Sequence, residues 1–505
     1  MIKIFCRVMG ATVTIFEFSY PAVTERTRTD PTYRGAMTDE FDVIVIGGGP
    51  AGENAAAYAI AGSNRTAAIV EHELVGGECS YWACMPSKAL LRPGQVLEAA
   101  DALPGIPAGP LDVEAVLKRR DSFTHDHDDS SQVDWATSAG ITVIKGHGVI
   151  DGERAVTVDG TRKLRARQAV VLATGTTATV PKTPGLREAL PWTSRDATNL
   201  HEVPSRVAVI GGGVVATECA TWLSSFGAHV TLLVRGDALL KSAEPFAGTM
   251  VAEALGARGV DVRLSTAVNS VSRPDAKDTG EGHIHGGPVR IETSSGVIEV
   301  DEVIVAAGRG PTSADLGLSV IGLEDGKYVT TDDHLCAQGE WLYAVGDING
   351  RSPLTHMGKY QARVCGDVIA ARAESRGLRG PRYTASADNG QVPQVVFTSP
   401  EIAWVGRTEK KARDDGYDVE VVEIELAVAG SSLLRDDYSG RAKLVIDKAT
   451  DVILGATFAG PEVSELVHAA TIAVVGAVPL ETLWHAVPSY PTVSEVWLRL
   501  LEARR

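Results

Sequence analysis

Two cysteines, Cys79 and Cys84, are the residues of this chain best suited to do chemistry. Four residues separate them, and the surrounding segment, residues 76–88, reads as the start of a helix beside a dinucleotide-binding pattern. Backbone N–H groups and the dipole at a helix start stabilise a thiolate, and Lys88, one turn beyond Cys84, adds positive charge. The spacing therefore predicts a reducible Cys79–Cys84 disulfide with Cys84 as the stabilised thiolate.

Two other interpretations of the cysteine pair are a structural disulfide and two buried thiols. A disulfide between such near neighbours closes too small a loop to stabilise the fold much, and a zinc site usually brings a second cysteine pair. The remaining cysteines, Cys6, Cys219, Cys336 and Cys365, are isolated in the sequence. We favour the redox interpretation and predict no metal site, and we interpret the charged run at residues 124–129 as a solvated helix end or loop.

A glycine-rich turn precedes the cysteine pair. It lies in a βαβ pattern, with strands expected at residues 42–46 and 66–70 and a helix at residues 53–61. In such a turn the first glycine allows the tight bend, the second lets the backbone approach a pyrophosphate, and the third lets the helix pack on the strand. The three glycines are Gly47, Gly49 and Gly52.

The same pattern occurs a second time, beginning with a strand at residues 206–210. A helix through residue 226 and a strand at residues 230–234 follow. The residues at the three turn positions are Gly211, Gly213 and Ala216. One such turn is a weak indication, but two copies, each between a strand and a helix, predict two dinucleotide-binding units.

The two units differ at the end of their second strands, where Glu71 in the first unit corresponds to Arg235 in the second. A carboxylate there accepts hydrogen bonds from a ribose 2′-hydroxyl, as in FAD, whereas an arginine pairs with the 2′-phosphate of NADP. Lys241 is expected to add to that phosphate pocket. We therefore predict FAD in the first unit and NADPH in the second, with NADH as the alternative, rather than a solvated Arg235.

The composition bounds the class of protein. The chain has 505 residues, 44% of them hydrophobic, which allows about three domains of roughly 150 residues. Its net charge of −16 argues against nucleic acid or an anionic membrane as a partner. Six cysteines in so long a chain favour a reducing compartment, so we expect a cytoplasmic protein. The apolar run at residues 469–480 is too short to span a bilayer and is interpreted as a buried helix.

The predicted fold is α/β, with two Rossmann-like dinucleotide-binding domains and a C-terminal α+β dimerisation domain. Residues 273–288 are polar and glycine-rich, and we interpret them as a mobile hairpin loop whose His283 and His285 bind nothing. A further strand at residues 341–346 leads to Asp347, a carboxylate placed to hold a cofactor hydroxyl. The expected segments are an N-terminal extension, taken to be disordered (1–37), the FAD domain (38–185 and 311–387), the NADP domain (186–310) and the C-terminal domain (388–505).

From about residue 42 to residue 501 the chain resembles the FAD-dependent pyridine nucleotide-disulfide oxidoreductases, the group of dihydrolipoamide dehydrogenase, glutathione reductase and mercuric reductase. So many matches in the same order are specific for the group, although not for one member of it. The matching segments are residues 47–52, 76–88, 173–175, 211–218, 308–311, 344–347, 396–401 and 490–495.

The resemblance implies a homodimer in which NADPH reduces FAD and electrons pass to the cysteine pair and on to a small-molecule acceptor. It implies that Cys84 touches the flavin and that Cys79 is the interchange thiol. It also implies that Lys88 and Glu218 form an ion pair beside the flavin, where the lysine stabilises negative charge. The other residues that it implicates are Gly148 and Gly175 at the FAD, Asp347 at the ribityl chain, and Tyr490 and Glu495 in the closing motif.

The closing motif departs from the pattern of the disulfide-reducing members. They carry a histidine at its first position, where it shuttles the proton of the interchange thiol. This chain has Tyr490 there, and a tyrosine hydroxyl, which ordinarily ionises near pH ~10, is a poor base at neutral pH. His485 is a possible substitute, but we expect it on the surface of a helix. Mercuric reductases resemble the chain at this tyrosine but carry a C-terminal cysteine pair that is absent here.

The loop between the cysteines also departs from the pattern, because it contains the bulky Tyr81 and Trp82. The two rings could narrow access, offer a stacking face to a planar acceptor such as a quinone, or pack against the flavin domain. Our first hypothesis is an NADPH-dependent FAD oxidoreductase that reduces a small disulfide or related acceptor through Cys79 and Cys84. The alternative is an NADPH:quinone reductase in which reduced FAD reduces the acceptor directly. A metal-ion reductase or a weakly active flavin-binding protein comes third.

Overall fold

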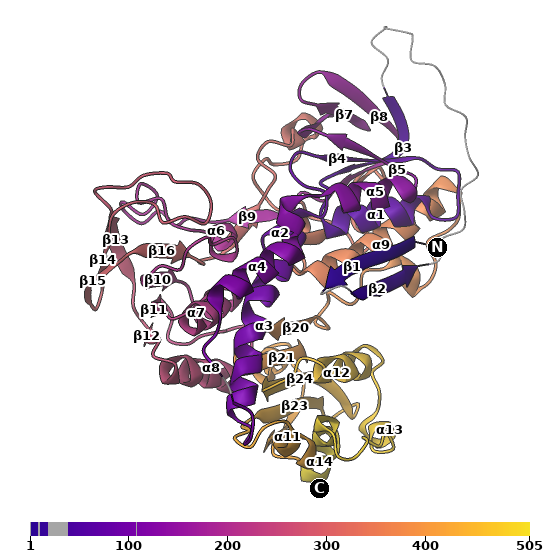
Figure 1. Cartoon of the computed structure of the whole chain (residues 1–505). Helices are drawn as coiled ribbons and strands as arrows, with labels where there is room; N and C mark the ends of the chain where they lie inside the picture. Colours follow the sequence, from indigo (N-terminus) through magenta and orange to yellow (C-terminus); the bar gives the residue numbers. More distant parts are fainter. Residues whose placement is uncertain (1, 9–10, 19–38, 108, 505) are drawn as a thin grey trace. The chain divides into compact units, whose positions relative to one another are not determined.

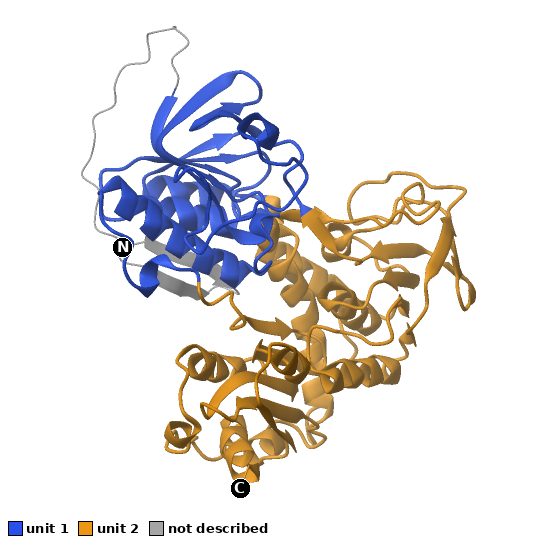
Figure 2. Ribbon diagram, turned by 180° about the vertical axis from the view of Figure 1, so that it is seen from behind, with its two compact units in different colours: residues 1–77, 128–175, 311–385 blue, residues 78–127, 176–310, 386–505 orange. Residues whose placement is uncertain are grey.

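The computed structural model describes residues 2–8, 11–18, 39–107 and 109–504 (Figure 1). The chain divides into two compact units, coloured separately in Figure 2. Unit 1 contains residues 1–77, 128–175 and 311–385, and unit 2 contains residues 78–127, 176–310 and 386–505. No helix in the described part of the chain combines the length and the apolar character needed to cross a bilayer.

Unit 1 is built on a sheet with the strand order β18-β19-β8-β3-β4-β5. Strands β19, β8, β3, β4 and β5 run parallel, so their carboxyl ends lie at one edge of the sheet. Strand β18 pairs antiparallel with β19. The strands are β3 (Asp39–Ile46), β4 (Ala67–Glu71), β5 (Ile141–Lys145), β8 (Arg162–Leu172), β18 (Cys336–Gln338) and β19 (Leu342–Ala344).

Two helices of unit 1, α1 (Pro50–Ile60) and α9 (Thr355–Ala373), pack closely on each other. Small residues of α1, among them Ala55 and Ala59, are fully buried, which brings the helix close to the sheet. The antiparallel strands β6 (Gly148–Gly152) and β7 (Ala155–Val158) extend the sheet from β8. The remaining elements are α5 (Ser130–Ser138) and the short 3₁₀ helices η2 (Leu318–Ile321), η3 (Gly346–Asn349) and η4 (Pro381–Tyr383).

The predicted N-terminal extension, residues 1–37, contains two strands. They are β1 (Ile2–Val8) and β2 (Ala11–Phe18), which pair antiparallel. The rest of the extension lies outside the described residues.

Unit 2 contains the second dinucleotide-binding pattern as a four-stranded parallel sheet in the order β12-β11-β10-β16. A smaller antiparallel sheet, β13-β14-β15, lies between β12 and β16 in the chain and is visible as a separate ribbon in Figure 1. The elements are β10 (Arg206–Ile210), α7 (Val214–Ser225), β11 (His229–Leu233), α8 (Pro245–Ala257), β12 (Asp261–Arg263), β13 (Val268–Ser272), β14 (Val289–Thr293), β15 (Gly296–Val300) and β16 (Glu302–Val305).

The loop that joins β13 to β14 was predicted to be mobile, and its packing differs from that prediction. Arg273 is buried at its start and donates to Glu302 at 2.7 Å, and both side chains are fully buried. The buried backbone N–H of His285 donates to the other oxygen of Glu302 at 3.0 Å. A fully buried ion pair, together with the hydrogen bond from His285 to Glu302, therefore holds both ends of this polar segment.

Unit 2 also contains the helices that follow the cysteines in the sequence. Helix α3 packs against α4 and α7, and Leu90 and Leu91 of α3 join the core beneath α7. The elements are α2 (Gly77–Tyr81), α3 (Cys84–Asp101), α4 (Val113–Thr124), η1 (His125–His127), β9 (Thr176–Ala178), α6 (Ser194–Thr198) and β17 (Arg309–Pro311). Segment 78–127 was predicted within the FAD domain, whereas its contacts place it in unit 2.

The C-terminal part of unit 2 is a five-stranded antiparallel sheet in the order β20-β21-β24-β23-β22. Its strands are β20 (Pro393–Val396), β21 (Glu401–Gly406), β22 (Val419–Glu425), β23 (Arg441–Asp447) and β24 (Val452–Gly460). Its helices are α10 (Glu409–Asp414), α11 (Ala429–Leu434), α12 (Leu466–Val475), α13 (Leu480–Leu483), η5 (Val493–Glu495) and α14 (Val496–Ala503). The α/β fold class and the change to an α+β arrangement at the C-terminal end agree with the sequence prediction.

Helix α12 covers the start of the apolar run that was predicted to be a buried helix. Only one of its faces is buried, because Ala470, Ala473 and Val474 face the sheet. On the opposite face Ile472 is 58% exposed and Val475 is 50% exposed. The prediction of a buried helix is therefore wrong within one subunit. Helix α12 carries apolar residues on both faces, but the subunit covers only the face that packs on the sheet.

Candidate active site

The cysteine pair spans the junction of two helices. Cys79 lies in the short helix α2, and Cys84 is the first residue of α3, as the sequence indicated. Both side chains are half-buried. At the first residue of an 18-residue helix, Cys84 lies where unpaired N–H groups and the helix dipole favour a thiolate.

The structure brings Lys88 and Glu218 together, as the resemblance implied. Lys88 Nζ lies 2.8 Å from Glu218 Oε2, and the Glu218 side chain is 5% exposed. The other carboxylate oxygen of Glu218 accepts the backbone N–H of Phe397 at 3.0 Å, and Lys88 Nζ lies 4.9 Å from the centre of the Phe397 ring. Because the carboxylate is fixed at both oxygens, it holds the ammonium group of Lys88 one turn below Cys84.

The aromatic residues between the cysteines are buried. Tyr81 is 1% and Trp82 is 6% exposed, and the ring centres of both lie within 6.1 Å of the His127 ring. Arg195 stacks over Trp82 at 4.3 Å, and Trp82 Nε1 donates to Glu281 at 2.9 Å. Rings packed in this way have no free face for a planar acceptor. The contacts with His127 also correct the interpretation of residues 124–129 as wholly solvated.

A charged pair beside Cys79 was not predicted from the sequence. Glu78 precedes Cys79 and forms an ion pair with Arg309, and its other oxygen lies 3.5 Å from Arg195. Arg309 also donates to the hydroxyl of Thr176 at 2.8 Å. A sequence signal was present, since Arg309 lies in a matching segment of the resemblance, but nothing in the sequence pairs it with Glu78.

The first glycine-rich turn follows β3 at the carboxyl edge of the sheet in unit 1. Gly47 has φ +103°, and a Cβ there would overlap the carbonyl oxygen of Ala173. A Cβ on Gly52 would overlap the carbonyl oxygen of Gly47. Only glycine fits both positions, and Gly49 is the N-cap of α1. The turn therefore presents bare backbone and a helix N-terminus, the arrangement that binds a pyrophosphate.

Glu71 ends β4 at the same edge. Its Oε2 accepts the N–H of Gly48 at 2.6 Å, and its Oε1 accepts the N–H of Glu73 at 2.7 Å. Burial alone would raise the pKa of Glu71, but the hydrogen bonds from His72, Gly48 and Glu73 hold it below its ordinary value. An ionised carboxylate at this position can accept a hydrogen bond from a ribose hydroxyl.

The other residues predicted at the FAD follow strands that end at this edge. Gly175 follows β8 with φ +69°, and Asp347 follows β19 in η3. Gly148 begins β6 next to the end of β4, where a Cβ would lie 3.0 Å from Val70. Parallel strands thus gather these residues with the glycine-rich turn and Glu71 on one edge of unit 1, whereas Lys88, also predicted at the flavin, belongs to unit 2.

The second glycine-rich turn borders a cavity of about 790 Å³ within unit 2. Gly211, Gly213, Arg235 and Lys241 all line it. Arg235 is exposed and, among the described residues, makes no ion pair, whereas Lys241 pairs with Asp237 at 2.5 Å. Ala216 does not line the cavity. Ala216 is fully buried, and a Cβ added to Gly211 would lie 3.4 Å from the Cβ of Ala216. Ala216 therefore contributes to the packing of the helix.

Arg309 and Ser194 also line this cavity, which connects it to the cysteine loop through Glu78. The cavity has the size of a small-molecule or cofactor site, and Arg235 and Lys241 give it a cationic wall.

The closing motif lies in the C-terminal part of unit 2. Tyr490 is 76% exposed. Glu495 is 5% exposed, and its Oε1 pairs with Arg499 at 2.6 Å. His485 was expected on the surface of a helix, but it lies in the turn after α13 and is exposed. Within the described residues, no group of three histidine, cysteine, aspartate or glutamate side chains is arranged to hold a metal ion.

Comparison with protein families gives two matches. The pyridine nucleotide-disulphide oxidoreductase family matches residues 41–362, and its dimerisation domain matches residues 392–501. The chain belongs to the pyridine nucleotide-disulphide oxidoreductases. The predicted resemblance and fold class are thereby confirmed, and the protein is a flavoprotein disulfide oxidoreductase, an enzyme of the dihydrolipoamide dehydrogenase type.

Relatives with different substrates are about equally similar. A mercuric reductase from Bacillus cereus is 29% identical over 474 residues, covering 93% of this chain and 72% of the relative. A dihydrolipoyl dehydrogenase from Chlamydia muridarum is 29% identical, covering 91% and 96%. The Cu(II) complex of the HOCl-induced flavoprotein disulfide reductase RclA from Escherichia coli matches with a TM-score of 0.79 at 23% identity, covering 93% of this chain and 100% of that one. This last match supports the fold.

Family membership implies FAD and a pyridine nucleotide as cofactors, and the residues present fit both. In unit 1 the glycine cradle of Gly47 and Gly52 and the carboxylate of Glu71 lie at one edge. In unit 2 the cavity has the glycine turn on one side and Arg235 on another. The match to the dimerisation domain supports a homodimer.

Proposed function

We propose that the protein is an NADPH-dependent FAD oxidoreductase that reduces a small disulfide or a related acceptor through Cys79 and Cys84. The observation that carries this proposal is the placement of Cys84 at the first residue of α3, above the Lys88–Glu218 ion pair. In the overall reaction the hydride of NADPH and one proton from solution reduce the acceptor. The acceptor's S–S bond breaks, two thiols form and NADP⁺ leaves.

The residues of unit 1 would hold FAD through its pyrophosphate and hydroxyl groups. Gly47, Gly49 and Gly52 present backbone N–H groups to the pyrophosphate, and Glu71 accepts from the adenosine ribose. Asp347 accepts from the ribityl chain, with Gly148 and Gly175 lining the site. When bound, FAD supplies the redox chemistry that couples hydride transfer from the nicotinamide to reduction of a disulfide.

The residues of unit 2 would select NADPH over NADH. Arg235 is exposed at the wall of the nucleotide cavity, with no carboxylate paired to it in the described part of the chain. A guanidinium group there binds a 2′-phosphate with charge-assisted hydrogen bonds, and Lys241 adds a second positive charge. A carboxylate, which would accept from the ribose of NADH, is missing at this position.

The two cysteines would have separate roles. Cys84, at the helix start above Lys88, is the thiolate that the charge of the helix and of Lys88 stabilises. Cys79, in α2, is the thiol that attacks the acceptor disulfide and forms a mixed disulfide, which Cys84 resolves. Glu218 supplies the counter-charge to the half-buried ammonium group of Lys88.

We propose a homodimer with the domain boundaries expected from the sequence: FAD domain 38–185 and 311–387, NADP domain 186–310 and C-terminal domain 388–505, with segment 78–127 of the FAD domain packed among the helices of unit 2. The exposed Tyr490 would be available to the second subunit, where it can donate a hydrogen bond to the acceptor. Glu495 would position this segment through Arg499.

A second candidate function is an NADPH:quinone reductase, in which the acceptor takes electrons without the cysteines. Tyr490 favours it, because a tyrosine at the position of the usual proton-shuttling histidine is a poor base. Steady-state turnover with NADPH separates the two functions, using menadione and dithiobisnitrobenzoate as acceptors. We expect Cys79→Ser to lower turnover with the disulfide at least 100-fold, because the variant cannot form the mixed disulfide. A variant that keeps wild-type turnover with the disulfide would rule out the first function in favour of the second.

A further inference from the structure

A second cavity, of about 310 Å³, lies along α3 within unit 2. It begins at Met85, the residue after Cys84, and continues for three turns of the helix. Residues three or four positions apart share one face of a helix, so the cavity follows a single face of α3. The α3 residues that line it are Met85, Lys88, Ala89, Leu91, Arg92 and Gln95.

The walls of this α3 cavity combine apolar surface with positive charge. Phe123 from α4 and Phe397 from the C-terminal domain supply aromatic rings, and Met85 is 42% exposed. Arg119, also from α4, supplies a guanidinium group. Glu401 supplies a carboxyl group with its own partner, since it accepts the N–H of Ser464 at 3.0 Å. Such walls suit a small molecule with an apolar body and a charged end.

Two of the three cations in the α3 cavity have carboxylate partners. Lys88 pairs with Glu218, and Arg92 lies 3.5 Å from Glu462. In the described part of the chain Arg119 makes no ion pair. Its Nη1 donates to the carbonyl of Ala89 at 2.8 Å, and its guanidinium lies 4.6 Å from the centre of the Phe123 ring.

The surroundings of Arg119 therefore favour an added negative charge. Burial and the like charge of Arg92 hold the pKa of Arg119 below its ordinary value. An anion placed between the two guanidinium groups would relieve their repulsion and accept hydrogen bonds from both.

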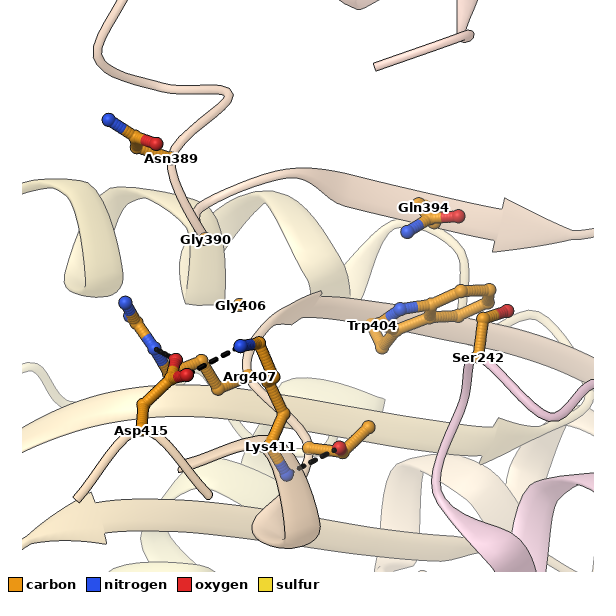
Figure 3. A pocket seen from close by; sticks show the side chains of 10 residues that line it. Ser242, Asn389, Gly390, Gln394, Trp404, Gly406, Arg407, Lys411 and Asp415 are labelled. Atoms are coloured by element: carbon orange, nitrogen blue, oxygen red, sulfur yellow. Dashed lines mark hydrogen bonds and ion pairs between the residues drawn. The ribbon is translucent and has the colours of Figure 1, made fainter. Parts of the chain in front are cut away.

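Another cavity of unit 2 shows the opposite arrangement. Figure 3 shows Arg407 and Lys411 pointing at the same carboxylate, that of Asp415. The two contacts measure 2.9 Å and 2.5 Å. Each of the two cations in this cavity of about 530 Å³ thus already has an ionic partner, unlike Arg119, although the single carboxylate offsets only one of their two positive charges.

We propose that the α3 cavity binds an anionic group of the electron acceptor, a carboxylate or sulfonate, and that Arg119 determines this specificity. The proposal rests on the function proposed above, because it places the acceptor beside the Cys79–Cys84 pair. Arg92 lies eight residues beyond Cys84, and a helix rises about 1.5 Å per residue, so the backbone of Arg92 lies roughly 12 Å along α3 from that of Cys84, the disulfide partner of the attacking Cys79. The substrate class is a small disulfide or electrophile with an anionic group at that distance.

Two disulfides that differ in charge test the proposal by steady-state kinetics with NADPH. Dithiobisnitrobenzoate is a dianion, and dithiodipyridine is neutral. We expect Arg119→Gln to raise the ratio of the two KM values, anionic over neutral, about tenfold, and Arg119→Lys to raise it less. The matched control is Arg290→Gln, because Arg290 is an exposed arginine of β14 that pairs with Glu292. An equal rise of both KM values in Arg119→Gln would overturn the proposal, since it would indicate a merely structural role.

A binding measurement separates this proposal from the proposed function. Nitrobenzoate has no disulfide bond, and the enzyme stays oxidised when NADPH is omitted, so equilibrium dialysis with the FAD-loaded enzyme reports binding alone. We expect binding that weakens with salt and is at least tenfold weaker in Arg119→Gln than in wild type or Arg290→Gln. No binding to wild type, or equal binding to Arg119→Gln, would overturn the anion site whatever the turnover. Binding as expected without disulfide turnover would overturn the proposed function alone.

Discussion

At the scale of single residues, the proposed preference for NADPH depends on Arg235. Its guanidinium group lines the nucleotide cavity, and among the described residues no carboxylate pairs with it. Hydrogen bonds between charged groups are worth about 1.5–3 kcal/mol, so Arg235→Ala should raise the KM for NADPH roughly 10- to 100-fold. The KM for NADH, which lacks the 2′-phosphate, serves as the internal control and should change less than threefold. Equal losses with both coenzymes would show that Arg235 does not read the phosphate.

The residues that the sequence predicted are those marked by a local pattern. Cys79, Cys84 and the glycines stand at fixed spacings within one turn or helix, so their positions follow from the chain alone. Glu218 came from the resemblance, because it meets Lys88 only through the packing of α7 on α3. Glu78 and Arg309 are 231 residues apart, and no local pattern joins them. The contacts of Trp82 with Glu281 and Arg195 could not be predicted from the sequence either.

At the scale of elements, α1 carries an acidic residue in an unusual position. Glu53 lies in its first turn, and within the described residues its Oε1 is buried without a hydrogen-bond partner. Burial raises the pKa of Glu53 from 4.5 to about 7, with Lys359 opposing and Glu71 adding to the shift. The unfolded chain releases this proton near pH 4.5, whereas the folded protein keeps it until about pH 7. Stability from this group is therefore complete at low pH and is lost as the pH rises through about 7.

Glu53→Gln tests this pH dependence, because the amide keeps the shape and removes the ionisation. In protein freed of flavin, we expect the variant to gain stability relative to wild type above pH ~7, by up to about 3 kcal/mol, and to gain little near pH ~5. Thermal unfolding followed by circular dichroism at both pH values measures the difference. A gain of the same size at both pH values would show that ionisation of Glu53 is not its cause.

Most elements of the two dinucleotide-binding patterns were predictable, because each strand and helix has a regular hydrophobic period and a glycine-rich turn separates strand from helix. Strand β10 has the predicted bounds, and α7 ends one residue before the predicted end. The packing of the loop at residues 273–288 was not predictable, because its polar composition gives no sign of the buried Arg273–Glu302 ion pair that holds it. The exposed face of α12 was not predicted either. An apolar sequence indicates burial, but it does not indicate whether the same subunit or a partner subunit covers the helix.

At the scale of the whole molecule, exposed apolar side chains gather in the C-terminal part of unit 2. Ile472 and Val475 lie one turn apart on α12 and are at least half exposed. The other large exposed apolar side chains described there are Tyr417, Leu433, Val487 and Tyr490, at 36%, 68%, 83% and 76%. Apolar surface of this kind usually marks an interface, in agreement with the match to the dimerisation domain.

Placing a charge on this face tests the homodimer. We expect Ile472→Glu to shift the protein from dimer to monomer, because burying an unpaired carboxylate costs several kcal/mol. Sedimentation velocity measures the mass directly. The matched control is Val297→Glu, at a valine of β15 that is 53% exposed and lies outside the C-terminal part. A dimer that persists in Ile472→Glu would place the interface elsewhere.

The organisation of the chain was predictable from the order of its patterns, whereas the grouping of its segments was not. The boundary at residue 310 coincides with a boundary between the two units. Segment 78–127 groups with unit 2 because of the packing of α3 on α7, which the sequence does not reveal. The cytoplasmic location and the physiological acceptor remain predictions.

The central claim is that Cys79 and Cys84 form a couple that stores electrons in exchange with bound FAD. An anaerobic titration of the FAD-loaded enzyme with NADPH, followed by absorbance, tests it most directly. We predict uptake of about two equivalents of NADPH per FAD, one for each two-electron couple, and a long-wavelength band from thiolate beside flavin after the first. Cys84→Ser should take up about one equivalent and lack the band. Uptake of one equivalent by the wild-type enzyme, without the band, would contradict the claim.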